Sequence, residues 1–217
     1  MDDLDLSNPY GAIACWVLSV YSMELGSPPF YAEFNKACRD IDTTRLNQFG
    51  PFAVALYWVC AGAEDKKNEE DKIPTGESFG GARDNLSGCF LLWRGAQMQQ
   101  QWLDPFLKNE GERVGLKGNT SCSRSPAVAL KFALDGIQSD KVPVLFLKCI
   151  RNYDGVNGIS MNSEVYSQYP SEGEILLMEG IRVYVLGHSV VEIKNKHPSV
   201  QQFAGNKVTV IYMFVTE

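Results

Sequence analysis

The sequence predicts an α+β fold in which a helical lobe is followed by a mostly antiparallel β-rich core. Three observations support this. Apolar residues recur at helical spacing within residues 1–63. Short apolar runs bounded by turn residues recur through residues 88–217. A chain of 217 residues, 45% hydrophobic and 21% charged, is long enough and apolar enough for one domain with a sizeable core.

The helical lobe should contain three helices. Asn8-Pro9 can cap and start the first, and Pro28-Pro29 ends it and starts the second. Gly50-Pro51 should open a third helix that is apolar nearly all round and therefore lies in the middle of the lobe. The expected buried positions of the first two helices are Ile13, Trp16, Val17 and Val20, then Phe30, Phe34, Ala37 and Cys38.

A charged and glycine-rich loop is expected over residues 64–87, between the two lobes. Residues 76–80 (GESFG) formally match the GxSxG nucleophile elbow of serine hydrolases. That motif needs a buried strand before it and a helix after it. A charged run precedes it here and Gly81 follows, so the match is not interpreted as catalytic.

Short strands dominate the rest of the chain, which we treat with the other segments as one domain spanning residues 1–217. They are expected at residues 89–93, 113–116, 142–150, 175–177, 181–186 and 208–215. Ser125-Pro126 is an N-cap and first-turn pair for a further helix. That helix should present Val128, Ala129, Phe132 and Ala133 on one face.

Composition excludes several classes of protein. The net charge of −6 argues against a nucleic-acid surface and against a polybasic membrane anchor. No apolar run approaches the roughly 20 residues of a membrane helix, and the acidic leader is unlike a signal peptide. We therefore expect a cytoplasmic, monomeric protein that does not bind membranes. The six cysteines form no CxxC, and with two histidines they predict no metal site. An even number of cysteines could form disulfides, but free thiols packed in a core are favoured.

Two short motifs could carry chemistry. Trp93-Arg94-Gly95 closes an apolar strand, where a guanidinium could grip an anion and a glycine could let the ligand approach the backbone. The alternative is a solvated surface arginine. Thr120-Ser121-Cys122-Ser123 places two serines on one face of an extended segment. The alternative is a serine-rich turn that leads to the Ser125 cap.

The third motif is an aromatic loop that leads through two glutamates into an apolar strand, residues 166–177 (YSQYPSEGEILL). At a period of two residues, Glu172 and Glu174 would share one face, about 7 Å apart. Two adjacent carboxylates repel each other, so a positive partner explains them better than structure does. The alternative is a pair of exposed charges at a sheet edge.

In this order, Arg-Gly, Ser-x-Ser and Glu-x-Glu resemble the R-S-E mono-ADP-ribosyltransferases, and in particular their arginine-directed branch of ecto-enzymes and clostridial-type toxins. The segment 169–176 (YPSEGEIL) is similar to the family's YPxExEVL run, and the likeness extends over residues 28–186. It implies an N-terminal helical lobe packed on a β-sandwich of the ADP-ribosyltransferase type. Cys122 stands where the family usually has Thr, and Trp93 where it usually has Tyr.

The resemblance implies NAD⁺ as a substrate. Arg94 would bind a phosphate, the Gly95 backbone the carboxamide, and Ser121 the nicotinamide side, while Glu174 would bond the ribose 2′-OH. Phe132 would stack on the nicotinamide ring, or else pack in the core.

The acceptor would be an accessible arginine of a target protein, bound and deprotonated by Glu172, with Tyr166 and Tyr169 in the loop that faces it. Three alternatives stay open: an NAD⁺ glycohydrolase, a transferase acting on another side chain, and a non-catalytic binding module.

Overall fold

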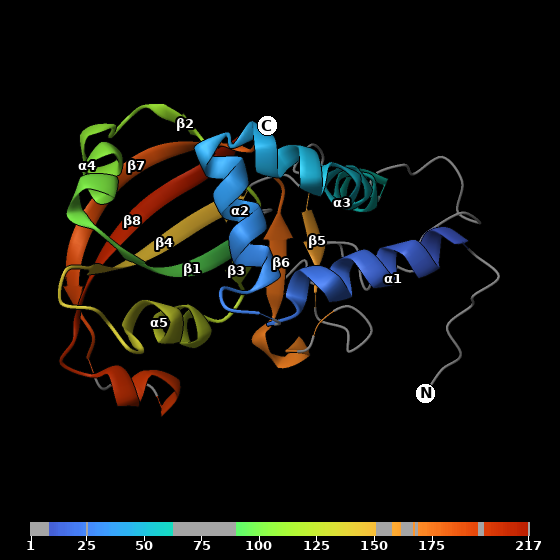
Figure 1. Ribbon diagram of the computed structural model, residues 1–217. Helices are drawn as coiled ribbons and strands as arrows, with labels where there is room; N and C mark the ends of the chain where they lie inside the picture. Colours follow the sequence, from blue (N-terminus) through green and yellow to red (C-terminus); the bar gives the residue numbers. More distant parts are fainter. Residues whose placement is uncertain are drawn as a thin grey trace. The chain divides into compact units, whose positions relative to one another are not determined.

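The computed structural model describes residues 9–24, 26–62, 90–150, 158–161, 167, 169–194 and 198–216 (Figure 1). The expected loop over residues 64–87 lies outside these ranges. The chain forms two compact units. The first, here called the helical unit, comprises Met1–Arg83, Lys117–Thr120 and Asn157–Gly180. The second, the sheet unit, comprises Asp84–Leu116, Ser121–Val156 and Ile181–Glu217.

The helical unit combines three helices with a pair of short strands. Its elements are α1 (Pro9–Ser22), α2 (Phe30–Asp40), α3 (Thr43–Gly62), β5 (Gly158–Ser160), the 3-10 turn η3 (Pro170–Glu172) and β6 (Glu174–Leu177). Strands β5 and β6 pair antiparallel. Buried side chains of the helices form one core with Met161, Leu176 and Met178. The three predicted helices are therefore confirmed, and the Glu-x-Glu strand belongs to the same unit.

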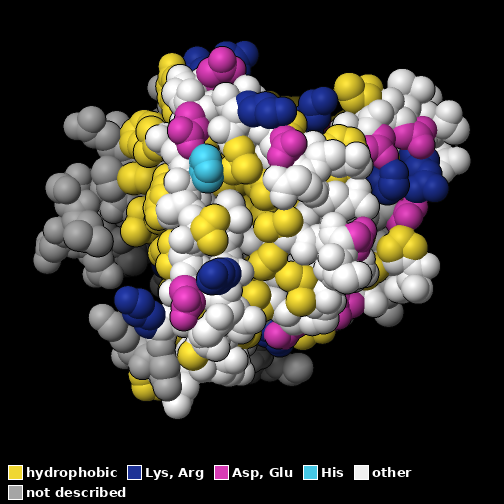
Figure 2. All heavy atoms as spheres, turned by 90° about the vertical axis from the view of Figure 1, so that its left-hand side faces the viewer, with side chains coloured by type: hydrophobic (Ala, Val, Ile, Leu, Met, Phe, Trp, Pro, Cys, Tyr) yellow, Lys and Arg dark blue, Asp and Glu magenta, His cyan; other side chains and the backbone are white. Residues whose placement is uncertain are grey.

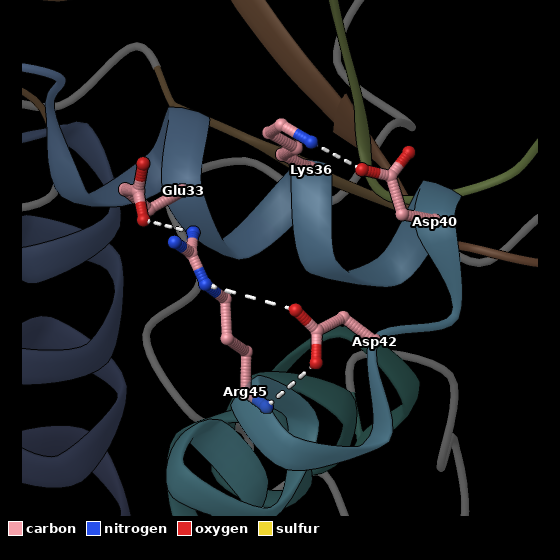
Figure 3. A network of polar contacts seen from close by, with 5 residues as sticks. All are labelled: Glu33, Lys36, Asp40, Asp42 and Arg45. Carbon is pink, nitrogen blue, oxygen red and sulfur yellow. Dashed lines mark hydrogen bonds and ion pairs between the residues drawn. The ribbon is translucent and has the colours of Figure 1, made fainter.

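The start predicted for the third helix is wrong. Helix α3 begins at Thr43, and Pro51 lies inside it. Asp42 supplies the start, because its Oδ1 accepts a hydrogen bond from the Arg45 backbone N–H at 3.1 Å (Figure 3). Its carbonyl oxygen accepts a further hydrogen bond from the Leu46 N–H at 2.8 Å. Arg45 also pairs with Glu33 of α2. An aspartate whose side chain accepts a hydrogen bond from the backbone N–H three residues later in the chain is a helix N-cap.

Two predicted apolar faces are also corrected. Ile13 and Trp16 of α1 are 49% and 61% exposed, whereas Val17 and Leu18 are fully buried. Helix α3 is not surrounded by the unit, because its Val54, Tyr57 and Trp58 side chains are exposed. It packs on one side only, through Leu56, Val59 and Cys60. The prediction for α2 is confirmed at Phe34, Ala37 and Cys38.

The sheet unit contains strands in the order β2 (Arg113–Gly115), β7 (Arg182–Glu192), β8 (Lys207–Thr216), β4 (Val142–Ile150), β1 (Phe90–Met98) and β3 (Thr120–Ser123). Strands β4 and β8 are parallel, and the other pairs are antiparallel. Helices α4 (Gln100–Lys108) and α5 (Pro126–Leu134) and the 3-10 helix η4 (Pro198–Phe203) complete the unit. The α+β class and the mostly antiparallel strands are confirmed.

Strand β1 is longer than predicted. It pairs with β4 without interruption from Phe90↔Ile150 to Met98↔Val142. Its second half, Arg94-Gly95-Ala96-Gln97, has no apolar run, so its strand conformation comes from pairing with β4 rather than from local pattern. Helix α4 was not predicted. Its Leu103 side chain is buried, and its Phe106 ring packs edge-on against the Phe146 ring of β4.

Helix α5 begins where the Ser125-Pro126 pair predicts. Its buried face consists of Ala129, Leu130 and Ala133. Ala129 and Leu130 pack with Leu145, Val208 and Val210 of the sheet. In Figure 2, which views the molecule from the side where α4, β7 and β8 lie in Figure 1, hydrophobic side chains gather between charged ones. Leu186, Val190 and Val191 of β7 are among the exposed hydrophobic residues.

Candidate active site

Arg94 lies inside β1, opposite Phe146 of β4, rather than at the end of a strand as predicted. Its side chain is half-buried. Its Nη1 donates a hydrogen bond to the carbonyl oxygen of Ser121 at 2.8 Å. This bond joins two of the three predicted motifs across 27 residues of sequence, so Arg94 is not simply a solvated surface arginine.

Gly95 is required by packing. A Cβ atom at this position would lie 1.7 Å from the Ala129 carbonyl oxygen and 2.8 Å from the Ala133 backbone nitrogen, both in α5. Such distances are far inside van der Waals contact, so only glycine lets α5 cross β1 this closely. The position that a side chain of residue 95 would occupy is filled by the backbone of α5, so the glycine is needed for packing whether or not its backbone also contacts a ligand.

The serine motif forms β3, in which Ser123 pairs with Trp93 of β1. Ser123 is buried, and its Oγ accepts a hydrogen bond from the Ser125 backbone N–H at 2.9 Å, just before α5. Ser121 is half-buried and contributes its carbonyl oxygen to Arg94. Ser123 therefore supports the turn into the helix, whereas Ser121 meets the guanidinium.

Lys148 of β4 was missed by sequence reasoning. It is 1% exposed, and its Nζ donates to the Sγ of Cys122 at 3.1 Å. Burial lowers the pKa of this ammonium, the nearby Arg94 lowers it further, and Cys122 opposes the shift. A lysine in the middle of the apolar run 142–150 was the available signal, because such a run predicts a strand buried on both faces.

The two glutamates lie in the helical unit. Glu174 is the first residue of β6, and its carbonyl oxygen accepts a hydrogen bond from the Met161 N–H at 2.8 Å. Glu172 ends the turn η3, and Gly173 between them has φ +58°. Because the backbone turns at this glycine, the period of two does not hold. The expectation that both carboxylates share a strand face is wrong.

The loop before the glutamates is a defined turn. The Tyr169 backbone N–H donates to the Oγ of buried Ser167 at 3.0 Å, and the Glu172 N–H donates to the Tyr169 carbonyl oxygen at 3.0 Å. The Tyr169 hydroxyl donates to Glu24 Oε2 at 3.2 Å, and Glu24, aided by Glu172, raises the pKa of that hydroxyl. Tyr169 is 43% exposed, whereas Tyr166 lies outside the described residues.

Phe132 lies on the outer side of α5 and is 54% exposed, so the alternative that it packs in the core is wrong. Between α5 and the sheet an open groove of about 300 Å³ is lined by Trp93, Leu130, Leu147, Val191, Tyr212 and neighbouring apolar residues. No charged residue lines it, so it offers nothing to a phosphate.

Three further findings concern the described part of the chain. The five cysteines there are thiols; Cys38, Cys60 and Cys122 are buried, whereas Cys15 and Cys149 are half-buried. Those residues include no cluster of three or more His, Cys, Asp or Glu side chains that could hold a metal ion. Within the same ranges, every helix is too short or too polar to cross a membrane.

The three-dimensional structure is similar to those of ADP-ribosyltransferases. Plx2a, an ADP-ribosyltransferase toxin from Paenibacillus larvae, matches with a TM-score of 0.60 and 12% identity over 94% of this chain and 86% of its own. Vis from Vibrio splendidus, in complex with agmatine, matches with a TM-score of 0.58 and 15% identity, over 99% of this chain and 84% of its own. C3stau2 from S. aureus, solved with NAD, matches with a TM-score of 0.54 and 15% identity, over 99% of this chain and 91% of its own.

No family model matches the sequence, and no curated protein matches it either. At these identities the similarity defines the fold, which is that of the ADP-ribosyltransferase toxins. The fold expected from the three motifs is confirmed.

Proposed function

We propose that this protein is a mono-ADP-ribosyltransferase that moves ADP-ribose from NAD⁺ to an arginine of a target protein and releases nicotinamide. The observation that carries the proposal is the bond from Arg94 Nη1 to the Ser121 carbonyl oxygen at 2.8 Å. It brings together the arginine and the serine of the motif order, within a fold that Plx2a, Vis and C3stau2 share.

Each predicted site residue has a role in the proposed reaction. Arg94 would hold a phosphate of NAD⁺ with its planar fork, and Ser121 would position the nicotinamide end. The Gly95 backbone would contact the carboxamide, and exposed Phe132 would stack on the nicotinamide ring. These four residues lie on β1, β3 and α5 of the sheet unit.

Glu174 would stabilise the reacting ribose. When the glycosidic bond breaks, nicotinamide leaves with the bonding electrons and the ribose becomes an oxocarbenium-like cation. An ionised carboxylate that bonds the 2′-OH stabilises this cation more than it stabilises bound NAD⁺. The acceptor nitrogen then bonds to the ribose C1′ and loses a proton.

Glu172 supports arginine as the acceptor. A guanidinium is charged at neutral pH and is a poor nucleophile, so it needs a carboxylate to bind it and take its proton. Glu172 ends the η3 turn beside exposed Tyr169, at the loop where an acceptor would enter. The agmatine held by Vis carries the same guanidinium group.

The acceptor assignment is tested with Glu172→Gln. The amide keeps the size of the carboxylate but cannot take the guanidinium's proton. We expect transfer to agmatine to fall about 100-fold or more, while hydrolysis of NAD⁺ by water falls less than threefold. The assay follows labelled ADP-ribosyl-agmatine and released nicotinamide in parallel.

Two outcomes would count against the acceptor assignment. If both rates fell together, Glu172 would serve NAD⁺ rather than arginine. If the wild type released nicotinamide but modified neither agmatine nor protein in a lysate, the protein would be an NAD⁺ glycohydrolase.

A further inference from the structure

A buried lysine that touches a buried cysteine is unexplained by the proposed reaction. Lys148 is 1% exposed and Cys122 is 3% exposed. Lysine is almost never fully buried unless its ammonium is paired with an opposite charge. Here the Nζ donates to a sulfur atom, Cys122 Sγ, at 3.1 Å. The amine and the thiol are therefore in direct contact inside the sheet unit.

The surroundings of Lys148 make its charged ammonium form less stable than it is in water. Burial lowers the pKa of the Lys148 ammonium, the positive charge of Arg94 lowers it further, and Cys122 opposes the shift. The Nζ lies 5.8 Å from the centroid of the Phe146 ring. A lower ammonium pKa increases the share of neutral amine, and the neutral amine is the nucleophilic form because its nitrogen has a free electron pair.

The backbone holds the two groups in register. Cys122 lies in β3, which pairs with β1 at Trp93↔Ser123, and Lys148 lies in β4, which pairs with β1 at Leu92↔Lys148. Both side chains are thus fixed by strands that flank β1. Groups held in contact react as if at very high concentration.

We propose that Cys122 and Lys148 are a modification site, at which hydrogen peroxide closes a covalent sulfur–nitrogen (sulfenamide) bridge. The Cys122 sulfur attacks one peroxide oxygen, the O–O bond breaks, and a sulfenic acid and water form. The Lys148 nitrogen then attacks this sulfur, the S–O bond breaks, and the leaving hydroxide takes a proton from the amine to form a second water. The sulfur is oxidised by two electrons and the peroxide is reduced.

The bridge is detected by peptide mapping after exposure to peroxide. The variant Cys149→Ser is the starting protein, because a Cys122–Cys149 disulfide would also join residues 118–124 to a peptide of β4 and would also be reversed by dithiothreitol. After peroxide, alkylation and trypsin, we expect residues 118–124 (GNTSCSR) linked to residues 142–151 (VPVLFLKCIR, with Ser in place of Cys149), with two hydrogens lost. Trypsin should no longer cut after Lys148, Cys122 should escape alkylation, and dithiothreitol should reverse all three changes.

Two variants serve as controls in that background. Lys148→Met keeps a long apolar side chain and removes the amine, so Cys122 should oxidise without cross-linking to β4. Lys141→Met removes the half-buried lysine that precedes the strand and should leave the bridge intact, which then joins residues 118–124 to residues 132–151.

Full alkylation of Cys122 after peroxide has oxidised other thiols would overturn the proposal. Recovery of Cys122 only as sulfinic acid, or only in a disulfide, would overturn it equally. These outcomes are read from the Cys149→Ser protein alone, so the result does not depend on the folding of the lysine variants.

Discussion

At the scale of single residues, Gly95 and Arg94 are neighbours with different tasks. Gly95 lets the α5 backbone cross β1, and Arg94 reaches the carbonyl oxygen of Ser121. The sequence identified both residues but did not reveal the packing role of the glycine, because no local pattern shows which helix will pack on a given strand. Contact between the guanidinium and Ser121 likewise depends on strand pairing across 27 residues.

Gly95→Ala should destabilise the protein strongly. The added methyl group would overlap the Ala129 carbonyl oxygen, and overpacking of this kind costs about 1–3 kcal/mol or more. Gly115→Ala in β2 is the matched control, since a Cβ there meets no atom within 4 Å. Urea unfolding would compare the two, and equal midpoints would contradict the packing described between α5 and β1.

Arg94→Lys should weaken NAD⁺ binding although the charge is kept. A lysine is a point charge and cannot form the two parallel bonds of a guanidinium with phosphate. We expect the Kd measured by calorimetry to rise about tenfold. The control is Arg113→Lys, which should leave the Kd for NAD⁺ unchanged. Arg113 is an exposed residue of β2, and its guanidinium lies over the Tyr184 ring. An unaltered Kd in the Arg94 variant would remove Arg94 from the site.

At the scale of elements, the helix and strand starts show where local signals suffice. The Pro28-Pro29 and Ser125-Pro126 signals locate the starts of α2 and α5 correctly. The Gly50-Pro51 signal fails because the Asp42 cap starts α3 earlier and the helix continues through Pro51. The turn at Gly173 could not be predicted either, because a glycine between two glutamates can adopt the extended backbone of a strand or the left-handed conformation that it has here.

Asp42→Ala should destabilise the helical unit by about 1 kcal/mol, because the Arg45 backbone N–H loses its side-chain acceptor. Asp40→Ala is the control, since it removes an exposed carboxylate that pairs with the side chain of Lys36 within α2 (Figure 3). Urea unfolding followed by helical circular dichroism should show a smaller loss for Asp40→Ala. A larger loss for Asp40 than for Asp42 would contradict the cap.

At the scale of the whole molecule, each of the two compact units is built from separate stretches of the chain. The glutamate motif of residues 172–174 lies in the unit formed by the N-terminal helices, whereas Arg94 and Ser121 lie in the sheet unit. The order of motifs along the chain was sufficient to predict the ADP-ribosyltransferase fold. It could not assign the segment 157–180 to a unit, because that depends on the packing of Met161, Leu176 and Met178 with the helices.

The central claim is that the protein cleaves NAD⁺ through the carboxylate of Glu174. The most direct test measures fluorescence released from etheno-NAD by the wild type, by Glu174→Gln and by Glu192→Gln, a control at an exposed glutamate of β7. We predict that the wild type and Glu192→Gln cleave the dinucleotide at similar rates, and that Glu174→Gln is slower by about 100-fold or more. Full activity of Glu174→Gln with an unchanged circular dichroism spectrum, or no cleavage by the wild type, would contradict the claim.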